Sequence, residues 1–296
     1  MVIWFLPTGE ETVTPRYPDL KNSVIICVIF LVFQIYVSLF MAVVAGSKGV
    51  VIVMSVVVPP LVILGIATRM NRTTLAATID WGRAGSRTII PLVLMTVSLA
   101  FIISEVENLT IRYLIPGDLY QSYLKRFLDI FFFESRADLA LGLASIALIG
   151  PFMEETVFRG VIYRGISSHR GSTYAVIASS VLFMVVHINP LQFPGALILG
   201  LIYATMISRG YRIADTFLAH SLHNTISLLF LFDVVTLPGM NSAPGGAVDH
   251  VSIWIILACG IVFAVAIQII IRWAPGPGVG NDVPPGTDLP RIPGGR

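Results

Sequence analysis

The order of apolar and polar positions along the chain is typical of a helical membrane protein. A membrane-spanning helix needs about 20 mostly apolar residues. Eight runs approach this requirement, and the fifth and sixth are the shortest. The runs are roughly Val24–Ala45, Val50–Ala67, Thr88–Ser104, Leu139–Phe158, Thr173–His187, Gly195–Ile207, Ile213–Phe232 and Val251–Ile271. The pattern therefore predicts an all-α, polytopic membrane bundle of about eight transmembrane helices.

Composition agrees with this prediction. Of the 296 residues, 55% are hydrophobic and 12% are charged, with a mean hydropathy of +0.84. Soluble domains carry about 25% charged residues. A net charge of +2 gives no reason to expect a nucleic-acid partner, so the lipid bilayer is the expected surroundings. Cys27 and Cys259 lie in separate apolar runs without a CxxC pair, which argues against a disulfide framework.

The chain divides into three predicted regions. Residues 1–21 form an N-terminal cytoplasmic segment, residues 22–273 form the eight-helix domain with its motifs in 139–232, and residues 274–296 form a disordered cytoplasmic tail rich in Pro and Gly. Within the domain, Tyr120–Phe133 is amphipathic and is expected to lie along the membrane interface.

The loops between the apolar runs differ in charge. If all eight runs span, one side carries the arginines, and the other side has few cations or is acidic on balance. Cytoplasmic loops are enriched in Lys and Arg. We therefore expect a multi-pass protein of the cell membrane with both termini in the cytoplasm. The arginines concerned are Arg69, Arg72, Arg83, Arg87, Arg164, Arg170, Arg209, Arg212 and Arg272.

Two adjacent acids, Glu154 and Glu155, follow an apolar run. A carboxylate at membrane depth is energetically costly, which makes such a residue a functional candidate. Neighbours on a helix point about 100° apart, so the two acids are not expected to face one ligand. Glu155 can pair with Arg159 four residues later, which leaves Glu154 as the freer acid. The alternative is that both acids meet water at a cytoplasmic helix end, which Arg164 and Arg170 would mark.

Two further polar pairs occur at helical spacing. Phe183 with His187, and His220 with Asn224, are each four residues apart and share a helix face. Taken singly, such residues often only hydrogen-bond between membrane helices. Taken together, a carboxylate, a histidine that shares its proton and a histidine–amide pair that holds an oxyanion are sufficient for peptide hydrolysis.

A metal ion is the competing explanation for these residues. One glutamate and two histidines can hold zinc and leave a position open for water. The sequence has no HExxH, however, and asparagine is a poor zinc ligand. We therefore expect no cofactor, with zinc as the alternative.

Three motifs occur in order on successive apolar runs: EExxxR (Glu154, Glu155, Arg159), FxxxH (Phe183, His187) and HxxxN (His220, Asn224). In this the chain resembles the CPBP family, which contains type II CAAX prenyl endopeptidases and the bacteriocin-processing or immunity relatives called Abi proteins. The similarity covers roughly Leu139–Phe232.

The resemblance implies an intramembrane glutamic endopeptidase. Its substrate would be a membrane-associated peptide or protein, prenylated or otherwise lipidated in part of the family. Glu154 and His187 would activate water, and His220 and Asn224 would form the oxyanion site. The supporting or substrate-binding residues would be Glu155, Arg159 and Phe183.

Two other functions stay open at this point. A proton-coupled transporter also uses buried Glu and His, although it would favour inverted repeats, and none is obvious here. A non-catalytic membrane immunity or scaffold protein would bind a peptide without cutting it.

The catalytic assignment carries a geometrical condition. Residue counting places Glu154 and His187 at depths that differ by on the order of 10 Å. The two side chains meet only if the helix of Glu154 extends to about Ile166, or if the following helices break near Pro190. Pro151 could also tilt the helix.

Overall fold

The computed structural model describes residues 15–79, 81–82, 84–130, 132–133, 135–241 and 248–276. Within these ranges the chain forms helices and no strand, which confirms the predicted all-α fold. Most of the predicted N-terminal segment (1–14) and tail (277–296) lies outside the described residues. The α-helices are α1 (Leu20–Val44), α2 (Lys48–Met70), α3 (Leu75–Ile79), α4 (Ile89–Leu114), α5 (Gly117–Ile130), α6 (Arg136–Ala144), α7 (Gly150–Glu155), α8 (Arg164–Arg170), α9 (Ser172–Val186), α10 (Phe193–Ser208), α11 (Ile213–Leu231) and α12 (Ile253–Arg272). A 3₁₀ turn, η1 (Ser86–Thr88), precedes α4, and two π-helical stretches, η2 (Ser145–Ile149) and η3 (Thr156–Tyr163), flank α7.

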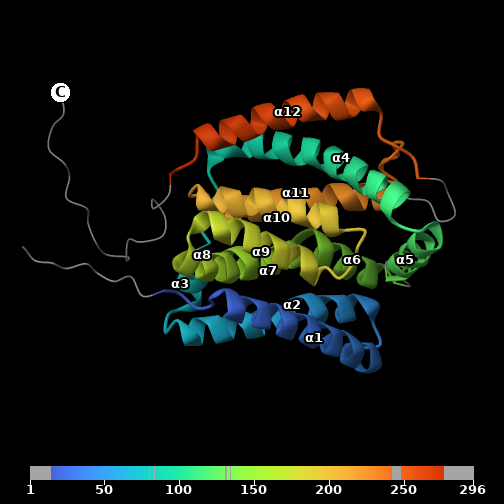
Figure 1. Ribbon diagram of the computed structural model, residues 1–296. Helices are drawn as coiled ribbons and strands as arrows, with labels where there is room; N and C mark the ends of the chain where they lie inside the picture. Colours follow the sequence, from blue (N-terminus) through green and yellow to red (C-terminus); the bar gives the residue numbers. More distant parts are fainter. Residues whose placement is uncertain are drawn as a thin grey trace, which may run out of the picture.

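The long helices lie side by side in layers (Figure 1). α1 and α2 form one outer layer, α4 and α12 form the other, and α6 to α11 lie between them. One cluster of buried apolar side chains joins the α1–α2 layer to the middle, and a second joins the middle to α4 and α12. The middle layer, which carries the three motifs, is therefore held from both sides.

One helix runs continuously from Arg136 to Arg170, through α6, η2, α7, η3 and α8. It extends well beyond Phe158, where the apolar run was expected to end. The predicted condition for Glu154 and His187 to meet is thus fulfilled, because the helix continues past Ile166. π-helical stretches inside α-helices are frequent at functional sites.

Pro151 accounts for the first π-helical stretch. Proline has no backbone N–H and cannot donate to the carbonyl four residues earlier. At the same turn the Gly150 N–H donates to the Ser145 carbonyl, five residues back. In a regular α-helix that N–H would donate to Ile146. The Ile146 carbonyl is therefore available to another donor.

Five of the described helices are long and apolar enough to cross a membrane: Leu20–Val44, Lys48–Met70, Ser86–Leu114, Arg136–Arg170 and Ile253–Arg272. The remaining three predicted runs correspond to α9, α10 and α11. α9 and α10 are apolar but shorter, and the polar side chains of α11 lower its hydropathy. Each predicted run thus lies on a helix, but the count of eight spanning helices is not confirmed.

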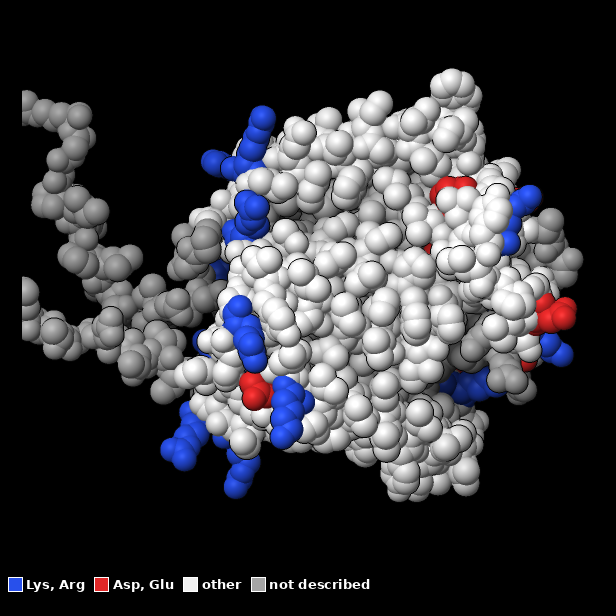
Figure 2. All heavy atoms as spheres, in the orientation of Figure 1, with Lys and Arg blue, Asp and Glu red and all other residues white. Residues whose placement is uncertain are grey.

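The surface is that of an integral membrane protein. The outer helices expose large apolar side chains such as Val32 and Val43 of α1 and Trp254 and Ile261 of α12. Soluble monomers rarely expose apolar area on this scale. Lys and Arg gather mainly at one end of the molecule, and the middle of the surface in view is almost free of charge (Figure 2). α5, which contains most of the predicted amphipathic stretch, lies at the opposite end, beyond the long helices (Figure 1).

Candidate active site

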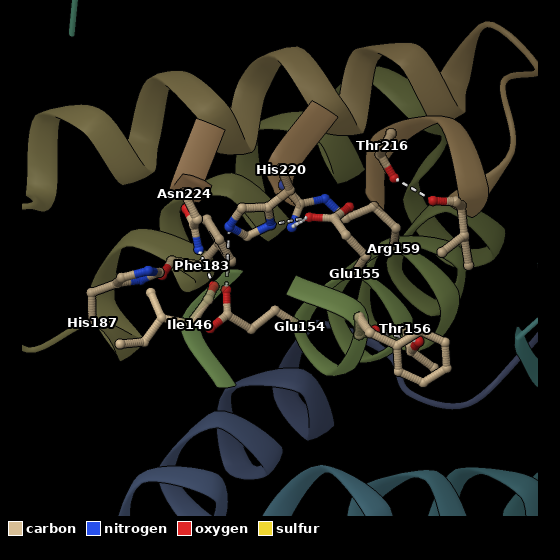
Figure 3. A network of polar contacts seen from close by, with 12 residues as sticks. Ile146, Glu154, Glu155, Thr156, Arg159, Phe183, His187, Thr216, His220 and Asn224 are labelled. Atoms are coloured by element: carbon tan, nitrogen blue, oxygen red, sulfur yellow. Dashed lines mark hydrogen bonds and ion pairs between the residues drawn. The ribbon is translucent and has the colours of Figure 1, made fainter. Parts of the chain in front are cut away.

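Residues of the three motifs lie close together in space (Figure 3). Glu154 and Glu155 end α7, His187 follows the last turn of α9, and His220 and Asn224 lie one turn apart on α11. α11 packs against both η2 and α7, while α9 packs against η3. The long helix with the glutamates is therefore the element that joins the two histidine motifs.

All four predicted catalytic side chains line one cavity of about 460 Å³, within the range of small-molecule sites. They are Glu154, His187, His220 and Asn224. A second hollow of about 420 Å³ lies toward α1, where Gln34 and Ser38 line it. Glu154 and His187 line both hollows, so these two side chains stand where the hollows adjoin.

Glu155 is fully buried, and the negative charge of its carboxylate is compensated by neighbouring side chains. Its Oε1 lies 3.1 Å from Arg159 Nη1, which is the ion pair expected from their spacing. The same oxygen lies 2.9 Å from His220 Nδ1 in a hydrogen bond. Breaking such a buried pair is strongly destabilising because it leaves an uncompensated charge. The position of Glu155 thus suits a residue that holds the site together.

Arg159 is also buried, with only 2% of its side chain exposed. Its guanidinium lies 4.5 Å from the centre of the Phe183 ring and 5.4 Å from that of Tyr203. The contact with Glu155 is an ion pair without hydrogen-bond directionality, since Nη1 and Nη2 have no hydrogen-bond partner among the described residues. Aromatic faces attract a cation most strongly when it is desolvated, so they share in its stabilisation.

His220 contacts both glutamates, contrary to the expectation that the two acids cannot face one ligand. Nδ1 bonds to Glu155, and Nε2 lies 3.7 Å from Glu154 Oε2. The two carboxylates do diverge along the helix, but the imidazole carries a nitrogen on each side and reaches both. The nearest described polar partner of His220 is therefore Glu155 rather than Asn224, with which it was predicted to act.

Glu154 is the more accessible of the two acids. Its side chain is 31% exposed and it borders both hollows. The distance of 3.7 Å to His220 is too long for a hydrogen bond. Residue 158, four positions later, is Phe and offers no cation. Glu154 thus keeps the freedom to accept a proton from a molecule in the cavity.

His187 is oriented by the backbone of its own motif. Its Nδ1 lies 2.8 Å from the Phe183 carbonyl, and its ring packs edge-on to the Phe183 ring at 4.7 Å. A carbonyl oxygen only accepts, so Nδ1 carries the hydrogen of this bond and Nε2 of the neutral ring is an acceptor. Phe183 also contacts His220 edge-on, with ring centres 5.9 Å apart. The phenylalanine of FxxxH therefore positions both histidines.

Asn224 binds the carbonyl that the π-helical turn leaves open. Its Nδ2 donates to the Ile146 oxygen at 2.9 Å (Figure 3). The amide nitrogen has two hydrogens, so one of them is available for a second acceptor. Pro151 was a visible signal for a helix distortion in the sequence, but the use of Ile146 could not be deduced from it.

Metal ligation was the alternative explanation for these residues. Among the described residues no group of three His, Cys, Asp or Glu side chains is arranged to hold a metal ion. His220 already directs one nitrogen to Glu155, and Asn224 is engaged with the backbone.

Comparison with known proteins supports the motif assignment. Residues 136–226 match the family model described as type II CAAX prenyl endopeptidase Rce1-like. This segment is similar to the domain that the family model describes. It contains all three motifs and confirms the predicted resemblance to the CPBP family, although it covers less than half of the chain. A search of curated proteins and a search of solved structures each gave no match.

The structure adds two residues to the candidate site that the sequence pattern did not single out. Tyr203 of α10 is fully buried, with its ring centre 5.7 Å from that of His220. Glu107 of α4 lines the same cavity as Glu154. Glu107 lies beyond Ser104, where the sequence pattern predicts the third apolar run to end, whereas the helix continues to Leu114.

Proposed function

We propose that the protein is an intramembrane endopeptidase that hydrolyses a peptide bond of a membrane-associated peptide or protein. The observation that carries the proposal is that Glu154, His187, His220 and Asn224 line one cavity among apolar helices. The match to a protease family supports the reaction class. The second hollow, toward α1, supports a membrane-associated substrate. Its lining combines polar side chains (Gln34, Ser38 and Glu154) with apolar ones, so it can accept a peptide that is partly in contact with lipid.

In the proposed mechanism, Glu154 and His187 activate the attacking water. The Glu154 carboxylate and His187 Nε2 both act as proton acceptors in this arrangement. A water held between them gives up a proton as its oxygen bonds to the scissile carbonyl carbon. When the tetrahedral intermediate collapses, the C–N bond breaks and the stored proton passes to the leaving nitrogen.

In the proposed mechanism, Asn224 and His220 stabilise the oxyanion by donating hydrogen bonds to it. One Asn224 amide hydrogen is held by Ile146, and the other is free to donate to the oxyanion. His220 Nδ1 donates to Glu155, so His220 Nε2 can donate as well only in the imidazolium form. Fixed donors aimed at a developing oxyanion usually make the largest single contribution to such catalysis.

The direct test is hydrolysis of an internally quenched library of membrane peptides by the purified full chain in liposomes. The wild-type protein should release fluorescence and the Glu154→Gln variant should not. A wild-type protein without activity on any peptide, or a Glu154→Gln variant with wild-type activity, would reject the proposal. Parallel farnesylated and unmodified peptides show whether a lipid on the substrate raises kcat/KM.

We also predict that turnover needs no transition metal, because hydrogen-bonding groups provide both the base and the oxyanion donors. Elemental analysis of the purified protein should find far less than one metal ion per chain, and a chelator should leave activity unchanged. About one zinc per chain, with activity lost on chelation and restored by zinc, would contradict this mechanism.

A further inference from the structure

The mechanism leaves one acid of the cavity unused. Glu107 lies near the end of α4 and borders the same space as Glu154. The energetic argument that singled out Glu154 applies equally here, since an ionisable residue inside a membrane helix is expected to have a function or a partner.

Glu107 differs from its close neighbour Glu105. Glu105 Oε1 lies 2.8 Å from His250 Nδ1, and its Oε2 accepts from the Val251 N–H at 2.9 Å. Glu107 has no hydrogen bond or ion pair with any described residue. Of two acids spaced two residues apart, one is satisfied by the chain before α12 and the other faces the cavity.

Among the described residues, no permanently cationic side chain lines the cavity to neutralise Glu107, and its basic groups are the histidines His187, His220 and His223. No lysine or arginine is among the described residues that line it, while two carboxylates are. The amide side chains of Asn108 and Gln192 line the same cavity. The side chain of Asn108 already donates to the Gly239 carbonyl at 2.7 Å. The charge balance of this space therefore favours a cationic occupant.

The helix opposite Glu107 leaves room for its carboxylate. At Gly195 of α10, an added Cβ would come within 2.5 Å of Glu107 Oε1 and 2.9 Å of Ile103. The glycine thus allows the carboxylate to lie against the α10 backbone instead of being displaced. The carboxylate therefore packs closely against α10 at the cavity wall.

Resting on the proposed endopeptidase function, we propose that Glu107 forms a subsite for an ammonium or guanidinium group of the substrate. The group comes either from a Lys or Arg side chain near the scissile bond or from a free amino terminus. In a desolvated site a close charge pair contributes strongly to specificity. Glu107 would therefore determine which peptides are hydrolysed, while Glu154 activates the water that hydrolyses them.

The test compares matched peptides on the full chain in liposomes. One set is N-acetylated and carries a single Lys moved through successive positions, each paired with a peptide that has norleucine there. A second set lacks Lys and differs only in a free or acetylated amino terminus. We expect one Lys position, or the free terminus, to raise kcat/KM by about tenfold or more in the wild-type protein. Glu107→Gln should bring that ratio close to one, and Glu107→Lys should favour a peptide with Glu at that place.

Glu105→Gln is the matched control, because it neutralises an acid of the same helix that does not line the cavity. It should keep the wild-type ratio, and a ratio is independent of the folded fraction of each sample. Equal rates for both peptides of every pair in the wild-type protein, or a ratio that Glu107→Gln leaves unchanged, would overturn the subsite. If Glu154→Gln is inactive in that case, the proposed function survives and only the subsite fails.

Discussion

At the scale of single residues, Glu154 and Glu155 are chain neighbours in opposite surroundings. Glu155 is sealed between Arg159 and His220, whereas Glu154 is partly exposed and borders both hollows. A buried ion pair that loses one partner leaves an unpaired charge, which costs about 3–5 kcal/mol. Replacement of an accessible carboxylate by the isosteric amide carries no such penalty.

The two glutamine variants should therefore fail in different ways. Glu154→Gln should abolish turnover with a melting temperature close to that of the wild-type protein. Glu155→Gln should lower the melting temperature strongly, because Arg159 loses its carboxylate. Turnover and melting temperature measured on the same detergent-purified samples separate the effects. A Glu155→Gln protein of normal stability, or an unstable Glu154→Gln protein, would contradict the assignment of roles.

The sequence patterns name four candidate side chains that line one cavity, but they predict few of the contacts between these side chains. The four-residue spacing of Glu155 with Arg159 correctly gave an ion pair, because helix geometry alone determines it. The contact of His220 with both glutamates depends on how α11 lies against α7, and no local pattern contains that information.

Asn224 provides a second contrast between structure and catalysis. Asn224→Ala should lower turnover by about 10²–10³-fold, as loss of a single oxyanion donor does, with little change in KM. It also leaves the Ile146 carbonyl without its donor, which costs about 1–3 kcal/mol. Turnover is therefore measured well below the melting temperature of the variant.

Asn224→Asp is the matched variant because it keeps the size of the side chain and removes the amide hydrogens. It should be as poor in turnover as Asn224→Ala. Normal turnover per folded molecule in either variant would show that Asn224 only ties α11 to the long helix.

At the scale of helices, the distortion around Pro151 links the fold to the site. The π-helical turn directs the Gly150 N–H to Ser145 and leaves Ile146 to Asn224. Proline inside a helix costs about 3 kcal/mol relative to alanine. The chain thus keeps a locally unfavourable residue immediately before the acids of the site, where it alters backbone bonding.

Pro151→Ala should therefore raise the stability of the fold and lower the turnover rate. Alanine restores an N–H, favours regular α-helical bonding and draws Gly150 back toward the Ile146 carbonyl. We expect a raised melting temperature and a loss of turnover on the order of tenfold to a hundredfold, since small displacements of catalytic groups are costly. Pro59→Ala, within α2 and away from the cavity lining, is the control and should leave turnover unchanged. If Pro151→Ala keeps wild-type turnover, the helix distortion at Pro151 is not needed for catalysis.

Helix ends were predicted less well than helix positions, for a physical reason. Charged residues in an apolar pattern suggest the membrane interface, so the pattern predicts ends near Phe158 for the fourth run and Ser104 for the third. Arg159 is buried against a carboxylate and two rings, and Glu105 is satisfied by His250. Both charges are compatible with a continuing helix, and only tertiary contacts reveal this.

At the scale of the whole molecule, the distribution of charged residues indicates how the protein is oriented in the membrane. The turns after α2, α8 and α10 carry arginines at one end, and α5 lies at the other (Figures 1 and 2). Cations concentrate on the cytoplasmic side of membrane proteins. We therefore infer that the arginine-rich end faces the cytoplasm and that α5 faces the opposite side of the cell membrane. Tyr120 and Leu124 of α5 line the same cavity as Glu154, so in this orientation one end of the cavity lies on that side.

Single cysteines test this orientation directly. In a background with Cys27→Ala and Cys259→Ala, Ser122→Cys on α5 and Thr73→Cys after α2 each place a thiol at an exposed position. A membrane-impermeant maleimide added to intact cells should label Ser122→Cys and leave Thr73→Cys unlabelled. After permeabilisation both should react, which controls for local accessibility. Labelling of Thr73→Cys alone in intact cells would invert the orientation, because the cations would then lie outside.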